Sequence, residues 1–287
     1  MTGNAKCKWS VRLEARLGLG ICSAVGLQWS ATRQMWNGDY GFLLSNLIQK
    51  DFKVRYRNMS LGVLWSLLNP LVTMAVLTFV FTKIFPSHRP HFPVFLLCGL
   101  VPFNFFTMAW STGTSSLLEN AGIMKRVPIP REIVPIAAVL GNCPHLAIQI
   151  GLLLAFTLGF GNGINWHWLW LPVLFGLEIV FVCGLALVTS AINVFVRDTR
   201  YVVESINTIL FWMVPIFYSF EDIQPRYRVI YRFNPLAALV LALRNILLDS
   251  TSPRMLLFLQ LALSSVFMLV LGLFVFRRLK DRFYDYL

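Results

Sequence analysis

The chain has 287 residues, of which 57% are hydrophobic and only 13% are charged, and its mean hydropathy is +0.66. Soluble domains are about 25% charged, so this composition excludes an ordinary water-soluble domain and indicates one polytopic membrane domain. The net charge of +12 also occurs in nucleic-acid-binding proteins, but in so apolar a chain basic residues mark cytoplasmic loops beside anionic lipid. We therefore expect membrane lipids, and no nucleic acid, as partners.

Residues 1–39 form an N-terminal extension of uncertain meaning. Residues 17–29 are apolar and follow four basic residues, as in a signal peptide, but the cleavage site is poor and the run is too short to span a membrane. The alternative is that Met35 is the natural start, because the patterned sequence begins only after it. Residues 1–34 are therefore uninformative about fold.

Residues 40–58 are predicted to form an amphipathic helix on the membrane surface. Apolar residues recur at every fourth position, at Leu44, Ile48, Phe52 and Tyr56. Its basic residues, which would meet lipid head groups, are Lys50, Lys53, Arg55 and Arg57. The alternative is a solvated helix packed on a soluble domain, but the composition offers no such domain.

Residues 59–287 are predicted to form an all-α transmembrane domain. Apolar runs long enough to cross a bilayer lie at about 61–85, 93–115, 134–160, 169–196, 203–220 and 256–277. A shorter run at 236–248 contains Arg244 and Asn245, so we expect a re-entrant segment at about 223–252.

The distribution of basic residues favours six crossings over seven. With six crossings and a cytoplasmic N-terminus, 18 of the 25 Lys and Arg residues fall on the cytoplasmic side and 7 on the outer side. A seventh crossing would move the four basic residues that follow Phe276 to the outer side. Both termini are therefore predicted to be cytoplasmic.

The sequence contains no catalytic or metal-binding motif. There is no Gly-Lys pair, and hence no P-loop for nucleotide phosphates; the five cysteines lack C-x-x-C spacing, and His88 with His91 is a weak metal signal. Glu178 is the only acidic residue deep in a predicted span. It could couple transport to protons, or it could be protonated or paired with Asn142 or Gln149.

The connection between the second and third spans reads SLLENAGIMKRVPIPREIVP. Apolar residues at helical spacing are surrounded by charged ones, and three prolines end the segment. A short amphipathic helix of this kind can insert into a groove of a partner protein. A plain connecting loop is the alternative.

Six ordered motifs carry a resemblance to a known family. They read DFKVRYRNMSLGVLWSLLNP, LLCGLVPFNFF, LLENAGIMKRVPIPREIVP, NVFVRDTRYV, WMVPIFYS and FNPLAALVLALRNILL. From about Tyr40 to its end, the chain resembles the membrane subunit of polysaccharide-exporting ABC transporters, the ABC-2 permease family. The resemblance implies six spans, an interface helix, a cytoplasmic coupling helix after the second span, and re-entrant gate helices before the sixth.

The resemblance also implies partners and cargo. Such permeases are homodimers in the bacterial cytoplasmic membrane and pair with two copies of a separate ATPase subunit, which holds the ATP and Mg. They are transport subunits rather than enzymes, and they export lipid-linked glycans such as O-antigen, capsular polysaccharide or teichoic acid.

The family's functional positions can be carried onto this sequence. The positions expected to couple to the ATPase are Glu119, Asn120, Lys125, Arg126, Pro130 and Arg131. Arg197 and Asp198 match an Arg-Asp pair after the fourth span, where opposite charges can pair and cap a helix. The aromatic residues expected to line a glycan canal are Trp65, Phe79, Phe211, Trp212, Phe217 and Tyr218.

Two other functions remain open at this point. One is an ABC-2 exporter of a drug or small lipid, which would have a closed pocket instead of a canal. The other is a membrane glycosyl- or acyltransferase, which usually needs clustered acids or a histidine, whereas Glu178 and His145 are isolated in the sequence.

Overall fold

The computed structural model describes residues 40–56, 64–84, 91–125, 130–220, 223–224, 226, 231 and 234–285, and within these ranges every regular element is a helix. The chain divides into two units, Met1–Leu44 and Ser45–Leu287. In the first unit only residues 40–44, at the start of one helix, are described. The second unit is a bundle of long helices, and everything below concerns this unit.

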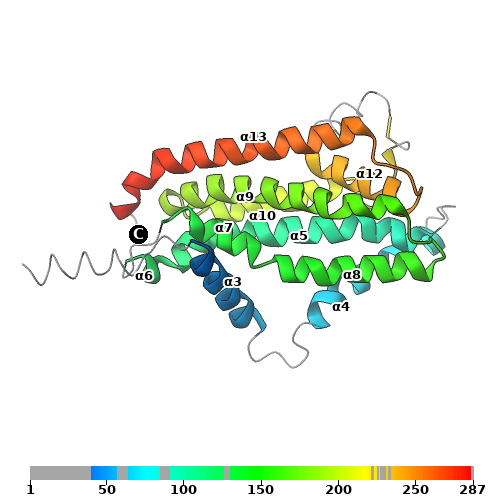
Figure 1. Ribbon diagram of the computed structural model, residues 1–287, viewed down its shortest axis with the longest axis horizontal. Helices are drawn as coiled ribbons and strands as arrows, with labels where there is room; N and C mark the ends of the chain where they lie inside the picture. Colours follow the sequence, from blue (N-terminus) through cyan, green and yellow to red (C-terminus); the bar gives the residue numbers. More distant parts are fainter. Residues whose placement is uncertain are drawn as a thin grey trace, which may run out of the picture. The chain divides into compact units, whose positions relative to one another are not determined.

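The helices follow one another along the chain as shown in Figure 1. They are α3 (Tyr40–Tyr56), α4 (Leu64–Phe79) continued by the π-helix η1 (Val80–Ile84), α5 (Phe92–Glu119), α6 (Ala121–Met124), α7 (Ile133–Leu140), α8 (Cys143–Gly159), the 3-10 helix η2 (Trp166–Trp170), α9 (Leu171–Phe195), α10 (Thr199–Met213), α12 (Pro235–Leu247), α13 (Met255–Leu279) and the 3-10 helix η4 (Lys280–Asp285).

The helix α5 is the centre of the bundle. It contacts α4, α7, α8, α9, α10 and α12, and most of its residues are buried, including the fully buried Phe105 and Phe106. A helix that is apolar all round and packed on all sides is a core helix. The outer helices α4 and α13, in contrast, bury few of their apolar side chains, which is expected of surfaces that face lipid or another membrane protein.

A polar seam joins α5 to α9 inside this core. The Trp110 indole donates to the Thr189 hydroxyl at 3.2 Å, and the Thr189 and Thr114 hydroxyls lie 2.7 Å apart. The Asn193 amide donates to the Thr114 carbonyl at 3.0 Å. Such interhelical hydrogen bonds fix the register of two apolar helices that could otherwise slide past one another.

The helices α9 and α13 cross at two glycines. A Cβ atom added at Gly272 would lie 2.5 Å from the Gly184 carbonyl oxygen, and one added at Gly184 would lie 2.5 Å from backbone atoms of Met268. Only glycine therefore permits this closeness, since small residues let helix backbones approach in membranes.

Five of the helical stretches that the structure describes are long and apolar enough to cross a membrane, so the chain is a multi-pass membrane protein. They are Leu64–Ile84, Phe92–Glu119, Ile133–Gly159, Trp166–Phe195 and Met255–Leu279. They coincide with the apolar runs expected as the first, second, third, fourth and sixth spans. The third is interrupted at Gly141–Asn142, where the Asn142 amide donates to the Thr112 hydroxyl at 2.9 Å and so ties the break to α5.

The fifth expected span differs from the prediction of 203–220. The helix α10 has 15 residues and ends at Met213, so it is about 22 Å long and falls short of a full crossing. It ends because Val214 is extended (ψ 135°), the conformation that a following proline favours, and Pro215 cannot continue the hydrogen-bonding ladder. The expected re-entrant segment contains α12, a largely buried helix of 13 residues.

Candidate functional site

The connection between α5 and α7 (residues 120–132) leaves the bundle at the end where α13 also finishes (Figure 1). Asn120 caps α5 and is buried, and its amide donates to the Ser116 carbonyl at 2.9 Å. Glu119 and Lys125, on either side of the single turn α6, are exposed. Arg126 lies outside the described residues.

The start of this connection is attached to α3. The Lys50 ammonium group donates to the Asn120 side-chain oxygen at 2.5 Å and lies 3.5 Å from the Asp51 carboxylate. Of the other basic residues expected to face lipid, Lys53 is exposed, whereas Arg57 and the side chain of Arg55 are outside the described part. Lys50 thus has a protein partner that the helical pattern did not suggest.

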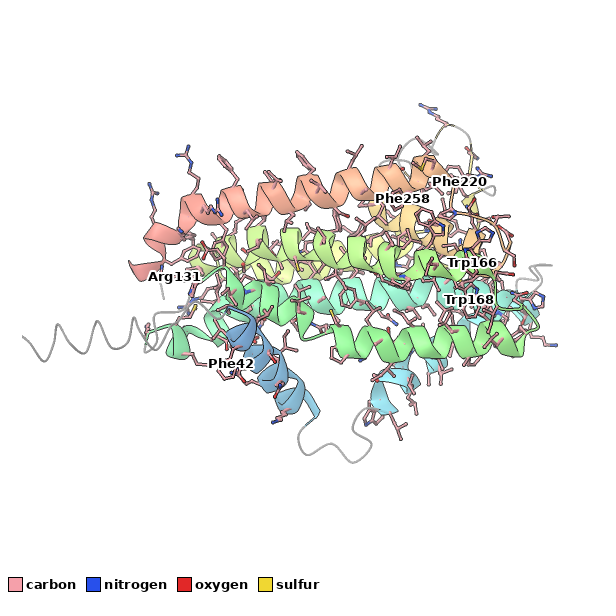
Figure 2. All side chains as sticks on the ribbon, viewed as in Figure 1. Phe42, Arg131, Trp166, Trp168, Phe220 and Phe258 are labelled. Atoms are coloured by element: carbon pink, nitrogen blue, oxygen red, sulfur yellow. The ribbon has the colours of Figure 1, made fainter. Side chains whose placement is uncertain are left out.

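The end of the connection is attached to the end of α13. The Arg131 guanidinium donates to the Lys280 carbonyl at 2.8 Å and lies 5.9 Å from the centre of the Phe283 ring, and the Lys280 ammonium group lies 3.2 Å from the Glu132 carboxylate. Figure 2 shows Arg131 at this end of the bundle. Pro130, just before it, is half-buried. The connection is therefore held at both ends and exposed at the turn between them.

The turn between α9 and α10 contains Arg197 and Asp198, both of them exposed. Asp198 occupies the N-cap position of α10, but its side chain makes no capping hydrogen bond, and no ion pair joins these two described residues. The expected pairing is therefore absent from the structure.

An aromatic cluster gathers at the opposite end of α10, centred on Phe217. Its ring lies 5.5 Å from Phe81, 5.4 Å from Trp212, 6.2 Å from Phe211 and 5.1 Å from Tyr218, measured between ring centres. Four of the six expected canal residues thus come together here. The other two, Trp65 and Phe79, are exposed on α4 by 50% and 59% and do not join the Phe217 cluster.

Arg244 of α12 holds the turn that follows α10. Its guanidinium donates to the carbonyls of Ile216 at 2.7 Å, Phe95 at 3.4 Å and Tyr218 at 3.4 Å, and it lies 3.4 Å from the centre of the Phe95 ring. The side chain is buried, so these contacts replace its hydration. In the sequence, Arg244 only argued against a crossing at 236–248, and nothing there identified its partners.

Glu178 is buried in α9 and neither carboxylate oxygen has a hydrogen-bond partner in the described part of the chain. The amides expected as partners are engaged elsewhere, because Asn142 donates to Thr112 and Gln149 contacts His145 at 2.9 Å. Among the described residues no three His, Cys, Asp or Glu side chains gather as metal ligands would. The geometry thus offers two candidate surfaces, the anchored connection and the aromatic cluster.

Comparison with known proteins adds an independent finding. Residues 43–248 match the family model of the ABC-2 type transporter. The chain is 30% identical over 257 residues to the O-antigen export system permease protein RfbA of Klebsiella pneumoniae, covering 89% of this chain and 99% of that protein. It is 28% identical over 246 residues to the protein of the same name from Myxococcus xanthus, covering 85% and 95%. It is 25% identical over 197 residues to the polysialic acid transport protein KpsM of Escherichia coli, covering 68% and 76%.

Proposed function

Because this chain belongs to the ABC-2 type transporter family, we propose that it is the permease subunit of an exporter that moves lipid-linked polysaccharide out across the bacterial cytoplasmic membrane. The observation that carries the proposal is the match to O-antigen export permeases over nearly their whole length. The cargo is a glycan of the O-antigen, capsular polysaccharide or teichoic acid type. Transport is driven by ATP hydrolysis in a separate subunit.

The anchored connection between α5 and α7 is the proposed contact with that ATPase. Its charged residues Glu119 and Lys125 are exposed, while Asn120 and Arg131 are bonded to α3 and α13, so a displacement of the exposed turn is transmitted to two other helices. The coupling role extends to Arg126 and Pro130 by their place in the segment. A homodimer of this chain with two ATPase copies gives one ATPase, with its ATP and Mg, to each connection.

The exposed face of α10 supports a canal for sugars. It presents Glu204, Ser205 and Thr208 beside Ile209 and Trp212, whereas the exposed face of α13 away from its ends is mainly Leu, Val and Phe. Polar and aromatic side chains together suit a sugar, which offers hydroxyl groups and a flat C–H face. In the homodimer, α10 and the exposed Trp65 and Phe79 of α4 would line the canal with the same residues of the second copy.

A total of six crossings requires α10 and the turn after it to make the fifth crossing. The Asn207 amide donates to Ser111 at 3.3 Å, and beyond the helix Ile216 packs against Gly99, far along α5 towards its start. The short helix plus the turn after it therefore runs along much of α5. The proposed six crossings, together with the excess of basic residues on one side, support a cytoplasmic location for both termini.

The proposal is tested by reconstituting the purified chain with its cognate ATPase and a lipid-linked polysaccharide in vesicles. ATP-dependent movement of long glycan chains is expected, and movement of small amphiphiles alone would overturn the cargo assignment in favour of a drug or lipid exporter. The substitution Lys125→Glu, alone or with Arg126→Glu, should abolish export while leaving the permease folded. The matched control is Lys83→Glu, an exposed lysine on η1, which should export normally. Normal export by the Lys125 variant would refute the coupling role.

A further inference from the structure

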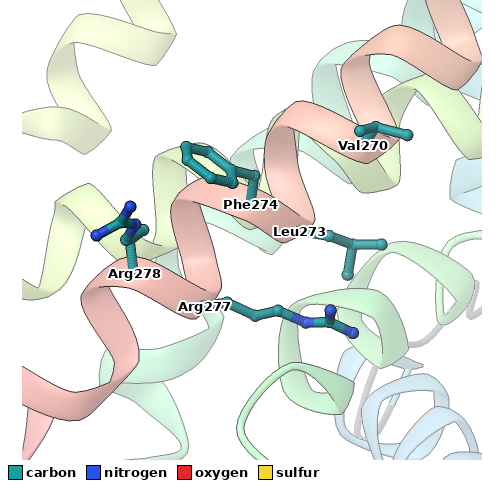
Figure 3. A pocket seen from close by; sticks show the side chains of 5 residues that line it. All are labelled: Val270, Leu273, Phe274, Arg277 and Arg278. Atoms are coloured by element: carbon teal, nitrogen blue, oxygen red, sulfur yellow. The ribbon is translucent and has the colours of Figure 1, made fainter.

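The outer face of α13 has a shallow cleft near the end of the helix (Figure 3). Its volume is about 460 Å³, and it is lined by Val270, Leu273, Phe274, Arg277 and Arg278. These positions are spaced by three, four and seven residues, so they form one stripe along the helix. The stripe is apolar at Val270 and basic about two turns later, at Arg277 and Arg278.

The apolar part of the stripe is uncovered. Val270 is 60% exposed and Phe274 is 58% exposed, and both lie within Met255–Leu279, one of the helices apolar enough to cross a membrane. Exposed apolar side chains on such a helix contact acyl chains when no protein covers them. The basic end of the stripe, at the last turn of the same helix, then lies at the level of the lipid head groups.

Arg277 and Arg278 form the basic end of the stripe. In the described part of the chain neither guanidinium forms an ion pair, and the one contact that Arg278 makes is with the Phe274 ring, 5.6 Å from the ring centre. Lys280, only two residues later, is different, because it is paired with Glu132 at 3.2 Å. Within the described residues, no carboxylate therefore pairs with the positive charge of Arg277 or Arg278.

The side chains that line the cleft project to both sides of the α13 axis. Figure 3 shows Phe274 and Arg278 leaning to one side of α13 and Leu273 and Arg277 leaning to the other. A phosphate at the foot of the stripe would lie between two long, flexible guanidinium side chains, the group best suited to bind phosphate oxygens in pairs. The carbonyl end of a helix disfavours an anion by about 0.3–1 kcal/mol, which is less than two arginines near a membrane surface provide.

We propose that this cleft is a specific site for an anionic phospholipid of the membrane. Arg277 and Arg278 hold the phosphate of the head group, and an acyl chain lies along Phe274 and Val270. The charge of the unpaired arginines and the uncovered apolar wall above them together match a lipid that is anionic at one end and apolar at the other. The site is separate from the proposed glycan canal and does not depend on it.

The test measures binding of phosphatidylglycerol and of phosphatidylcholine to the full-length chain in neutral detergent by native mass spectrometry. Phosphatidylglycerol should bind in preference to phosphatidylcholine, and Arg277→Gln with Arg278→Gln should weaken its binding roughly 30-fold, since each basic residue near the surface contributes about fivefold. The control is Arg254→Gln, an exposed arginine at the other end of α13, which should bind as the unaltered chain does.

Three outcomes would overturn the proposal. The first is an equal loss in the Arg254 variant, which would mean that any basic residue at a helix end attracts the lipid. The second is equal binding of phosphatidylcholine. The third is displacement of the lipid by inorganic phosphate at the same concentration, which would identify an anion site without a role for the apolar wall. Melting temperatures of the variants, measured in parallel, separate a lost site from a lost fold.

Discussion

The contact between Gly184 and Gly272 gives a prediction whose size follows from geometry. In Gly272→Ala the new Cβ would lie 2.5 Å from the Gly184 carbonyl oxygen and 3.1 Å from the carbonyl carbon and Cα of the same residue. Non-bonded heavy atoms prefer about 3.5 Å or more, so α13 must move away from α9 by about 1 Å. Overpacking of this kind costs about 1–3 kcal/mol, and the helical preference of alanine returns up to about 1 kcal/mol. A net loss of roughly 1–2 kcal/mol is expected.

The measurement is unfolding of the purified chain in mild detergent by added dodecyl sulfate, followed by tryptophan fluorescence. The matched control is Gly176→Ala on α9, where an added Cβ meets no atom within 4 Å. Gly272→Ala should unfold at lower dodecyl sulfate than the unaltered chain, whereas Gly176→Ala should be unchanged or more stable. Equal midpoints for the two variants would refute the argument that backbone contact between α9 and α13 requires glycine.

Two further substitutions test the anchors described above. Arg244→Met should lower the free energy of unfolding by roughly 2–3 kcal/mol in the same assay, because three carbonyls lose a charged donor in a buried place, and an unaltered midpoint would contradict that role. Asn120→Ala removes the acceptor for Lys50, and with it a charged hydrogen bond worth about 1.5–3 kcal/mol. Because the proposed coupling segment then loses its attachment to α3, the reconstituted complex should hydrolyse more ATP for each glycan that it exports. In the control Gln49→Ala, which loses only a weak contact to Ser45 on α3, this ratio should stay constant, and the coupling role of Asn120 fails if both variants give the same ratio.

The membrane helices were predictable where apolar length alone decides. Five of the expected runs correspond to helices, because a segment of about 20 apolar residues has few alternatives to a helix in lipid. The end of α10 was not predictable from apolarity. The run continues past Met213, but the backbone conformation before Pro215 stops the helix, and this is a local constraint that a hydropathy count does not include.

The anchors of the candidate site were less predictable, because their partners are distant in sequence. Lys50 lies 70 residues from Asn120, and Arg131 lies 149 residues from Lys280. A helical pattern shows on which face a basic residue lies, but not whether lipid or another helix meets that face. The same holds for Arg244, which in the sequence argued only against a crossing at 236–248, while its carbonyl partners lie on two other segments.

The unequal stiffness of the two anchors on the α5–α7 connection has a mechanical consequence. On one side, Arg131 and Glu132 bond to Lys280 at the end of α13, and the backbone of α13 packs closely against that of α9. On the other side, the hydrogen bond found among the described residues runs from the flexible Lys50 side chain of α3 to Asn120. A displacement of the exposed turn is therefore expected to move α3 more than α13. In the proposed coupling, α3 is the helix that moves, and the pair α9 and α13 stays in place.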